Sequence, residues 1–254
     1  MNASAPLVTL AGVGKRFPSG TDALAGLELA VRPGEFLSLV GPSGCGKSTA
    51  LRLIAGLIPP SDGQVRWDGG ERPRPGDIGF VFQEPTLMPW ARVLANVTLP
   101  LRLARLARAE AEARARDALA LVGLEGFERA FPRELSGGMR MRVSIARALV
   151  MRPRLLLMDE PFAALDEITR LKLNDDLLAL WAERGLAIVF VTHSVYESVY
   201  LSNRIAIMAA RPGRIVAELP VVAPYPRAAG FRHGATYGAA CAEVSAALGR
   251  AMAA

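Results

Sequence analysis

A glycine-rich stretch at residues 41–50, GPSGCGKSTA, has the residue types that bind phosphate groups. Closely spaced glycines let backbone N–H groups converge on phosphate oxygens, and the start of a following helix adds positive potential. Gly41, Gly46, Lys47 and Ser48 fit the spacing G-x-x-x-x-G-K-[ST], in which the lysine reaches the β- and γ-phosphates and the hydroxyl binds Mg²⁺. The alternative is a flexible turn before a helix, but the apolar run before the glycines and the helical spacing after them favour phosphate binding.

Two adjacent acids, Asp159 and Glu160, end the apolar run LLLMDE. At the end of a buried strand, Asp159 is placed to hold Mg²⁺ and Glu160 to polarise an attacking water. An isolated acid pair in this context is more typical of a strand that leaves the core. The phosphate loop upstream, in the expected chain order, favours the catalytic interpretation.

A second possible anion site lies in ELSGGMRMRVSIARAL, where Ser136 precedes two glycines and a helical pattern. Ser136 is a good helix N-cap, so an ordinary helix start is the alternative interpretation. Its hydroxyl and the backbone N–H groups of Gly137 and Gly138 could also bind phosphate. A chain with two phosphate loops suggests a nucleotide held between two chains, with one loop from each.

Apolar runs and turn residues predict the elements that position these groups. Strands are predicted at 6–13, 23–31, 35–40, 64–69, 77–83, 154–160, 186–193, 204–210 and 213–221. Helices are predicted at 48–57 and 166–185, and the chain between residues 87 and 150 is mostly helical. A proline-rich link at 220–226 leads to a short C-terminal helix. The pattern predicts an α/β core with a helical insertion.

Composition limits the possible partners. The 254 residues carry a net charge of +6, which is almost entirely due to arginine. Nucleic-acid binding and docking at an anionic membrane surface are two interpretations, and a genome-wide preference for arginine over lysine is the third. We favour the third, because the arginines are spread along the chain and interleaved with acids at helical spacing, as in Glu110 with Arg114 and Glu112 with Arg116. We therefore expect no nucleic-acid partner. The two cysteines form no disulfide framework, and the absence of a signal segment or a long apolar run predicts a soluble cytoplasmic protein.

Taken together, these motifs resemble the nucleotide-binding subunit of an ABC transporter over residues 7 to about 220. The shared motifs are GPSGCGKST (Walker A), VFQE (Q-loop), LSGGM (signature), LLLMDE (Walker B), ALDE (D-loop) and VTHS (H-loop), in the order of that family. The resemblance implies a P-loop NTPase core with a mixed sheet and an inserted α-helical subdomain, the ABC ATPase fold. It implies one domain over 1–254, with the core at 1–86 and 151–220, the helical subdomain at 87–150 and a C-terminal extension at 221–254.

The same resemblance implies an ATPase that uses ATP and Mg²⁺. Phe17 would stack on adenine, where the family often has tyrosine. The other nucleotide-contacting residues would be Gly41, Ser43, Gly44, Cys45, Gly46, Lys47, Ser48 and Thr49, together with Ser136, Gly137 and Gly138 acting on the nucleotide of a second protomer. Cys45 is interpreted as a small filler of the loop rather than a catalytic thiol.

The metal ligands implied are Ser48, Gln83 and Asp159, and the catalytic residues are Glu160, His193 and Gln83. His193 would contact the γ-phosphate, although a histidine after an apolar strand is more often a packed core residue outside such a motif. Asp166 would line the dimer interface. Met139 ends the signature, where many relatives have glutamine. We expect this difference to cost little phosphate binding, because the serine and the glycine backbone make the phosphate contacts.

Within the family, the stretches EPTLMPWARVLANVTLPL and VTHSVYESVYLSNRIAIMAARPGRI resemble the importers of nitrate, sulfonates and taurine, a group that includes transporters of pyrimidine precursors. The implied partners are a second copy of the chain, integral membrane permease subunits and a periplasmic or lipoprotein solute-binding protein. The implied location is the cytoplasmic face of the inner membrane. The alternatives are the ATPase of an exporter or lipid transporter, and a soluble ABC ATPase that acts on nucleic acid.

One further prediction concerns the segment that follows Gln83. Leu87, Met88 and Trp90 are large and apolar, and nearby prolines keep the backbone out of a regular helix. This surface would suit a short amphipathic helix of the permease. The alternative is that these side chains pack the junction between the core and the helical insertion.

Overall fold

The structure is a computed structural model that describes residues 5–68, 73–227 and 230–253. Gly69, the last residue of one predicted strand, lies outside these ranges. The chain forms two compact units: Met1–Arg72 with Trp181–Ala254, and Pro73–Leu180. The two units do not follow the predicted boundaries of a helical subdomain at 87–150, and that division stays a prediction.

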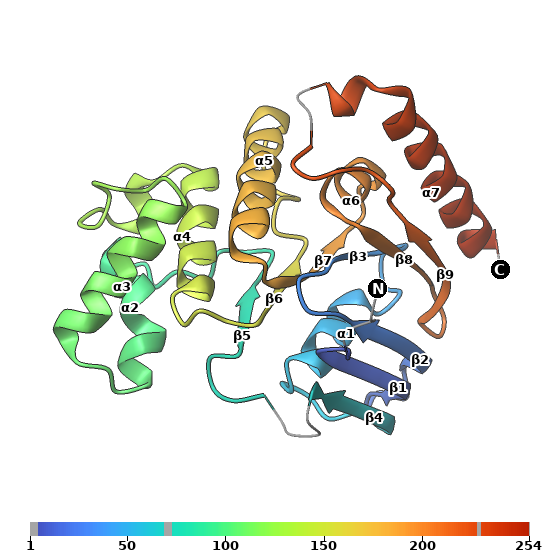
Figure 1. The fold of residues 1–254 in the computed structure, drawn as a ribbon. Coiled ribbons are helices and arrows are strands. Elements are labelled where there is room, and N and C mark those ends of the chain that lie inside the picture. The colour runs from blue at the N-terminus through green and yellow to red at the C-terminus, as the bar shows by residue number, and fades with distance from the viewer. Residues whose placement is uncertain (1–4, 69–72, 228–229, 254) are drawn as a thin grey trace. The chain divides into compact units, whose positions relative to one another are not determined.

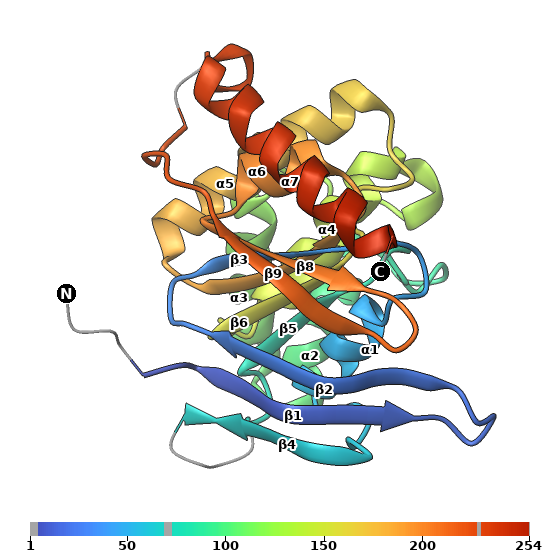
Figure 2. The same cartoon turned by 90° about the vertical axis from the view of Figure 1, so that its right-hand side faces the viewer.

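The first unit contains an antiparallel sheet of three strands, which Figure 2 shows with β1 between its two neighbours. The strands are β1 (Val8–Arg16), β2 (Asp22–Val31) and β4 (Asp62–Trp67). In β2 every second residue from Leu27 to Val31 is buried. This alternation is expected of a sheet with one face on the core and the other in water.

The same unit contains four strands of a second sheet: β3 (Phe36–Val40), β7 (Ala187–Thr192), β8 (Arg204–Ala209) and β9 (Arg214–Pro220). β3 lies between β7 and β8 and is parallel to both, whereas β9 is antiparallel to β8, so the sheet is mixed. Every residue of β3 and β7 is buried. Their continuous apolar runs are typical of parallel strands covered on both faces.

Three helices belong to this unit: α1 (Lys47–Ile54), α6 (Val195–Leu201) and α7 (Ala235–Ala253). A 3₁₀ turn, η3 (Phe231–His233), precedes α7, which packs against α6 and β8 (Figure 2). The prediction of a short C-terminal helix is wrong in length, because α7 has 19 residues. Alanine dominates its sequence, and alanine has the highest intrinsic helix propensity.

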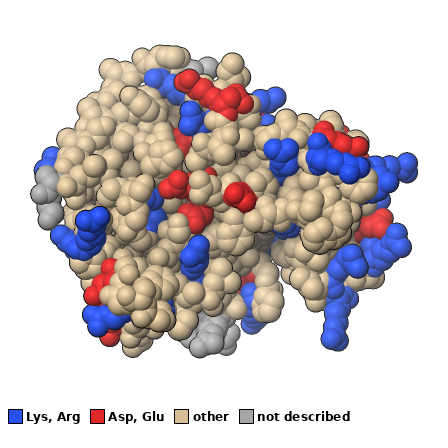
Figure 3. Space-filling model, turned by 180° about the vertical axis from the view of Figure 1, so that it is seen from behind, with Lys and Arg blue, Asp and Glu red and all other residues tan. Residues whose placement is uncertain are grey.

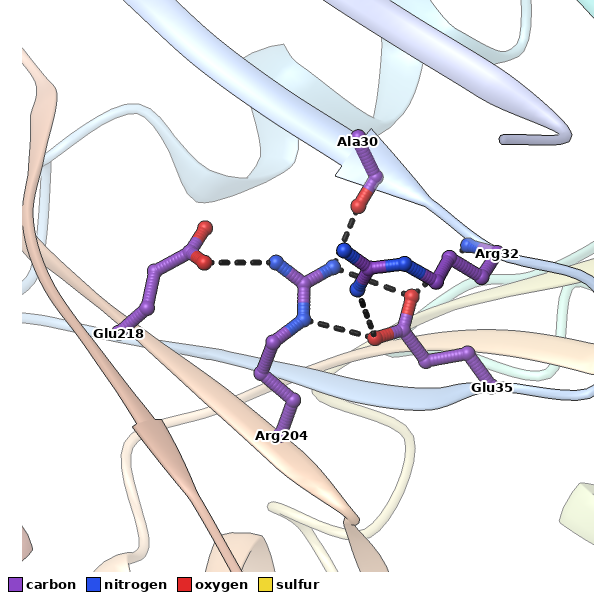
Figure 4. Close-up of polar contacts among 5 residues, drawn as sticks. All are labelled: Ala30, Arg32, Glu35, Arg204 and Glu218. Carbon is purple, nitrogen blue, oxygen red and sulfur yellow. Dashed lines mark hydrogen bonds and ion pairs between the residues drawn. The ribbon is translucent and has the colours of Figure 1, made fainter. Parts of the chain in front are cut away.

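A polar network fixes the start of β3, the strand that leads to the phosphate loop (Figure 4). Arg204 of β8 donates to both carboxylate oxygens of Glu35, at 2.7 and 3.0 Å, and to Glu218 of β9 at 2.8 Å. It also donates to the carbonyl oxygen of Ala30 in β2, and the Arg32 backbone N–H donates to Glu35 at 2.8 Å. A bidentate arginine–carboxylate pair restricts geometry more than a single contact does. The network therefore ties both sheets of this unit at the entrance to β3.

The second unit contains two parallel strands and most of the helices (Figure 1). The strands are β5 (Ile78–Val81) and β6 (Leu155–Asp159). The helical elements are α2 (Val93–Leu103), α3 (Arg108–Leu121), η2 (Pro132–Glu134), α4 (Gly137–Leu149) and α5 (Glu167–Arg184). The last turn of α5 belongs to the first unit. Helices α2, α3 and α4 pack on one another. The predicted helical stretch and the predicted helix at 166–185 are therefore confirmed.

The charged face of α3 is confirmed as well. Arg114 donates to Glu110 at 2.5 Å, and Arg116 donates to Glu112 at 3.1 Å. On the face drawn in Figure 3, basic side chains are scattered and acidic ones lie among them. Exposed pairs of this kind stabilise a helix only slightly. They keep the local charge balanced along the helix.

Cys45 and Cys241 are both buried free thiols. In the described part of the chain, no helix combines the length and the apolar character needed to cross a membrane.

Candidate functional site

The phosphate loop lies between the buried strand β3 and helix α1. Gly46 is the N-cap of α1, with φ +94°, and it offers no side chain to the first turn. A Cβ atom at Gly46 would lie 2.6 Å from Leu24 Cδ2 and 2.8 Å from the carbonyl oxygen of Ala23. Glycine is therefore required for both the backbone conformation and the space. The helix start, which lacks a side-chain cap, is the kind of site where phosphate binds.

Lys47 is held inside this loop. Its side chain is only 5% exposed, and Nζ donates to the carbonyl oxygens of Gly41 at 2.9 Å and Pro42 at 3.1 Å. A charged donor that contacts carbonyl oxygens can exchange them for an anionic phosphate oxygen, which binds it more strongly. Burial raises the pKa of the adjacent Cys45 thiol, which supports the interpretation of Cys45 as a filler.

His193 leaves the sheet beside the phosphate loop. Val40, the last residue of β3, pairs with Thr192, the last residue of the parallel strand β7. Gly41 and His193 therefore emerge at the same carboxyl edge of neighbouring strands. This edge is where open α/β sheets bind ligands. The His193 side chain is exposed there, so it is not a packed core histidine.

Phe17 lies at the tip of the hairpin between β1 and β2. Its ring is partly exposed, and Lys15 Nζ lies 5.7 Å from the ring centroid. The turn is closed by the Phe17 N–H, which donates to the carbonyl oxygen of Thr21 at 3.0 Å. The ring is thus accessible for stacking on a base.

In the second unit, strand register brings the acid pair together with Gln83. Val81, the last residue of β5, pairs with Met158 of the parallel strand β6. Asp159, the last residue of β6, and Gln83, two residues after β5, therefore lie at one carboxyl edge. Three of the predicted metal-binding and catalytic residues, Gln83, Asp159 and Glu160, are in this way brought to the same edge of this unit.

Glu160 has a backbone conformation that residues with side chains seldom adopt. Its φ is +46°, in the left-handed region. Such a conformation costs free energy and persists where the surroundings enforce it, most often at functional sites. The chain therefore changes direction at Glu160, directly after the buried strand. Glu160 also carries the carboxylate that we expect to polarise water.

The signature segment starts helix α4 in the second unit. Ser136 is the N-cap of α4, and its Oγ accepts a hydrogen bond from the Met139 N–H at 3.2 Å. Ser136 is exposed, whereas Gly138 is buried, and a Cβ there would lie 2.6 Å from Thr169 Cγ2. Asp166 caps the nearby helix α5 by accepting from the Thr169 N–H at 2.9 Å, and this hydrogen bonding lowers the pKa of its carboxyl group.

Sequence reasoning missed Arg147, a residue of α4. Its guanidinium donates to the carbonyl oxygens of Pro85 and Thr86 and to Thr86 Oγ1, each at 2.9 Å. Thr86 has φ +47°, which is rare for a β-branched residue. Arg147 therefore fixes a strained loop three residues after Gln83. The two partners are 61 residues apart in sequence, and no local pattern indicates their contact.

Comparison with known proteins gives the class. A family model described as ABC transporter matches residues 24–163. The aliphatic sulfonates import ATP-binding protein of Bacillus subtilis is 47% identical over 205 residues, 80% of this chain and 79% of that protein. The taurine import ATP-binding protein of Rhizobium johnstonii is 50% identical over 184 residues, 72% of this chain and 70% of that protein.

Among solved structures, a dimeric ATP-binding cassette in a post-hydrolysis state, bound to ADP and Pi, matches with a TM-score of 0.75 and 35% identity. The match covers 85% of this chain and 100% of that one. The chain belongs to the ABC transporter family, and its predicted fold class is confirmed. It is an ATP-binding subunit with ATPase activity.

Proposed function

We propose that this ATPase energises an importer of small organic or oxyanion solutes, such as sulfonates, taurine, nitrate or pyrimidine precursors. The observation that carries the proposal is the similarity to import ATP-binding proteins for aliphatic sulfonates and for taurine, at 47% and 50% identity. Its partners are integral membrane permease subunits and a solute-binding protein, and it acts at the cytoplasmic face of the membrane.

In the proposed reaction, the phosphate loop and Lys47 bind the phosphates of ATP, and Phe17 stacks on the adenine. Ser48 and Asp159 supply hard oxygen ligands of the kind Mg²⁺ prefers, with Gln83 as a further ligand. Bound Mg²⁺ neutralises charge that develops on the phosphate oxygens. Glu160 polarises the attacking water.

His193 contacts the γ-phosphate from the neighbouring strand in this scheme. Ser136, Gly137 and Gly138 act on the nucleotide of a second copy, so that two chains enclose two ATP molecules. The exposed position of Ser136 supports this assignment, and one relative of known structure is dimeric.

We also propose that the permease docks on the second unit, near Trp90. Trp90 is 77% exposed, which opposes a core role. Buried Asn96 holds the surrounding segment: its Oδ1 accepts from the Met88 N–H at 2.7 Å, and its Nδ2 donates to the carbonyl oxygens of Met88, Ala91 and Arg92. The indole is thus presented on a rigid backbone.

A groove of about 360 Å³ supports the same proposal. Its lining includes Phe82, Leu99 and Leu103, with Thr86 and Arg147 at the loop that follows Gln83. Leu103 is 75% exposed. An amphipathic helix places apolar residues of one face into grooves of this kind. Because Arg147 contacts the groove and the strained loop, nucleotide-dependent movement near Gln83 would reach the docked helix directly.

Trp90→Ala tests this docking, with Trp181→Ala as the matched control, because Trp181 is buried. Trp90→Ala should reduce assembly with the permease at least about tenfold while the melting temperature and ATP affinity of the isolated subunit stay unchanged, as expected for an exposed aromatic anchor. Trp181→Ala should lower the melting temperature. A Trp90 variant that unfolds easily but still assembles would contradict the docking role.

The cargo is tested by deleting the gene and supplying either the wild-type chain or the Lys47→Ala variant. Uptake of radiolabelled alkanesulfonate, taurine, nitrate and a pyrimidine precursor is then measured. We expect uptake of at least one of them to disappear on deletion and to return only with the wild-type chain. Unchanged uptake of all four in the deletion strain would overturn the proposed cargo range.

A further inference from the structure

A closed ring of hydrogen bonds surrounds the backbone at His193. Thr192 Oγ1 donates to Glu197 Oε2 at 2.5 Å and accepts from the Ser194 N–H at 3.0 Å. Ser194 Oγ in turn accepts from the Glu197 N–H at 3.3 Å. Each of the three residues is linked to the other two. We call these contacts the Thr192–Glu197 ring.

This ring differs from an ordinary capping box. In a capping box the glutamate at the third helical position reaches back to the backbone N–H of the N-cap residue. Ser194 is the N-cap of α6 and Glu197 holds that third position, but the Glu197 carboxylate contacts the Thr192 hydroxyl instead. The Thr192 hydroxyl in turn accepts a hydrogen bond from the N–H of Ser194, the N-cap residue. The hydrogen bonds therefore hold the residues on both sides of His193, which are Thr192 and Ser194.

Two of the three side chains in the ring are buried, and Ser194 is partly exposed. Thr192 is 2% exposed and Glu197 is 8% exposed. Thr192 is also paired with Val40 in the parallel sheet. His193 itself is exposed, and the residues on both sides of it, Thr192 and Ser194, are held by the hydrogen bonds of the ring. A hydroxyl that donates and accepts at once strengthens both hydrogen bonds in a buried site.

We propose that Glu197 is a positioning residue for His193, which it orients through Thr192 and Ser194 without touching the nucleotide. This inference rests on the proposed role of His193 at the γ-phosphate. Loss of the carboxylate frees the backbone at residues 192–194 and lets the imidazole move. A displacement of about 1 Å at a reacting centre can cost as much as ~10²-fold in rate.

The substitutions separate positioning from packing. Glu197→Ala removes the acceptor, whereas Glu197→Gln keeps a carbonyl oxygen that can accept the Thr192 hydroxyl proton. Thr192→Val removes the hydroxyl at nearly constant volume and gives a second disruptive variant. Ser198→Ala is the matched control, because buried Ser198 lies in the same helix but its hydroxyl donates to the carbonyl oxygen of Val195, at 2.8 Å, outside the ring.

The first readout does not depend on activity. The chain has two histidines, 193 and 233, so their imidazole proton resonances can be assigned with a His233→Gln variant. In the full-length protein we expect Glu197→Ala and Thr192→Val to shift or broaden the His193 resonances and to leave those of His233 unchanged. Glu197→Gln and Ser198→Ala should leave both histidines as in the wild type.

The second readout compares the effect of each substitution on kcat with its effect on KM. We expect Glu197→Ala and Thr192→Val to lower kcat for ATP about tenfold with KM within about twofold of wild type. Glu197→Gln should restore most of the activity. Unaltered His193 resonances in both disruptive variants, or equal losses of kcat in Glu197→Ala and Ser198→Ala, would overturn the positioning role.

His193→Ala distinguishes this inference from the proposed function. If His193→Ala hydrolyses ATP normally, the assigned role of His193 is wrong. If His193→Ala is impaired while Glu197→Ala and Thr192→Val are normal, the role of His193 stands and the positioning inference fails.

Discussion

The two glycine loops that precede α1 and α4 are organised in different ways. The loop before α1 has no side-chain cap at Gly46 and carries its own charge, because buried Lys47 is folded onto the loop carbonyl oxygens. The loop before α4 has no lysine, although Arg140 of α4 donates to the carbonyl oxygen of Leu135 in this loop at 2.7 Å. It satisfies its first turn with the exposed Ser136 hydroxyl, which accepts from Met139. We therefore expect the first loop to bind phosphate within one chain, and the second loop to contact a phosphate that another chain holds.

This difference predicts different roles for the two loops in nucleotide binding. A cradle with an internal cation can bind a nucleotide by itself, since charge-assisted contacts are the strong ones. In the proposed dimer, an exposed hydroxyl and two glycine N–H groups would add a few neutral contacts to a phosphate that the other chain holds. We therefore expect substitutions in the first loop to abolish binding, and substitutions in the second to affect assembly and turnover.

The largest effect is expected for Lys47→Ala. Loss of the buried ammonium should lower ATP hydrolysis by about 10²–10³-fold and weaken ATP binding, because an electrostatic contact to the transferred phosphate is lost. Lys172→Ala, an exposed lysine on α5, is the matched control and should behave as the wild type. Hydrolysis and titration with labelled ATP measure both effects. Near-normal turnover in Lys47→Ala would remove the contrast between the loops.

A smaller effect, on assembly alone, is expected for Ser136→Asp. Aspartate caps a helix as well as serine does, but its charge opposes a phosphate from a second chain. In a Glu160→Gln background, where slow turnover should let ATP-bound dimers accumulate, Ser136→Asp should abolish the dimer and keep ATP affinity within about threefold.

Sedimentation with ATP measures the dimer, and Ser136→Asn is the matched control, because it caps the helix without adding charge. Undiminished dimers in Ser136→Asp, or a large loss of ATP affinity, would show that the second loop does not act across a dimer.

The smallest effects concern glycine replacements and stability alone. Gly46→Ala should cost about 2–3 kcal/mol, because the residue is in the left-handed region and its Cβ would contact Leu24 and Ala23 closely. Gly137→Ala should change stability by less than about 1 kcal/mol, because its Cβ would meet Leu165 Cδ2 at 3.4 Å and α4 begins there. Urea unfolding compares the two variants. Equal costs would mean that the first loop is no more constrained than the second.

The sequence by itself was sufficient for the features that depend on neighbours along the chain. The strand before the phosphate loop, the N-cap at Ser136 and the ion pairs along α3 were all predicted, because each is encoded within a few residues. The predicted strand at 35–40 corresponds to β3, and the predicted helix at 166–185 corresponds to α5. The length of α7 was underestimated, because an alanine-rich segment has a weak amphipathic pattern despite its high propensity.

Only the tertiary structure decided which of these elements meet. The pairing of Val40 with Thr192 places His193 beside the phosphate loop, and the pairing of Val81 with Met158 places Gln83 beside Asp159. Strand order and register depend on packing between segments far apart in sequence, which no local pattern specifies. For the same reason the contact of Arg147 with Thr86 could not be predicted. The chemical groups are thus specified locally, whereas their convergence is a property of the folded sheet.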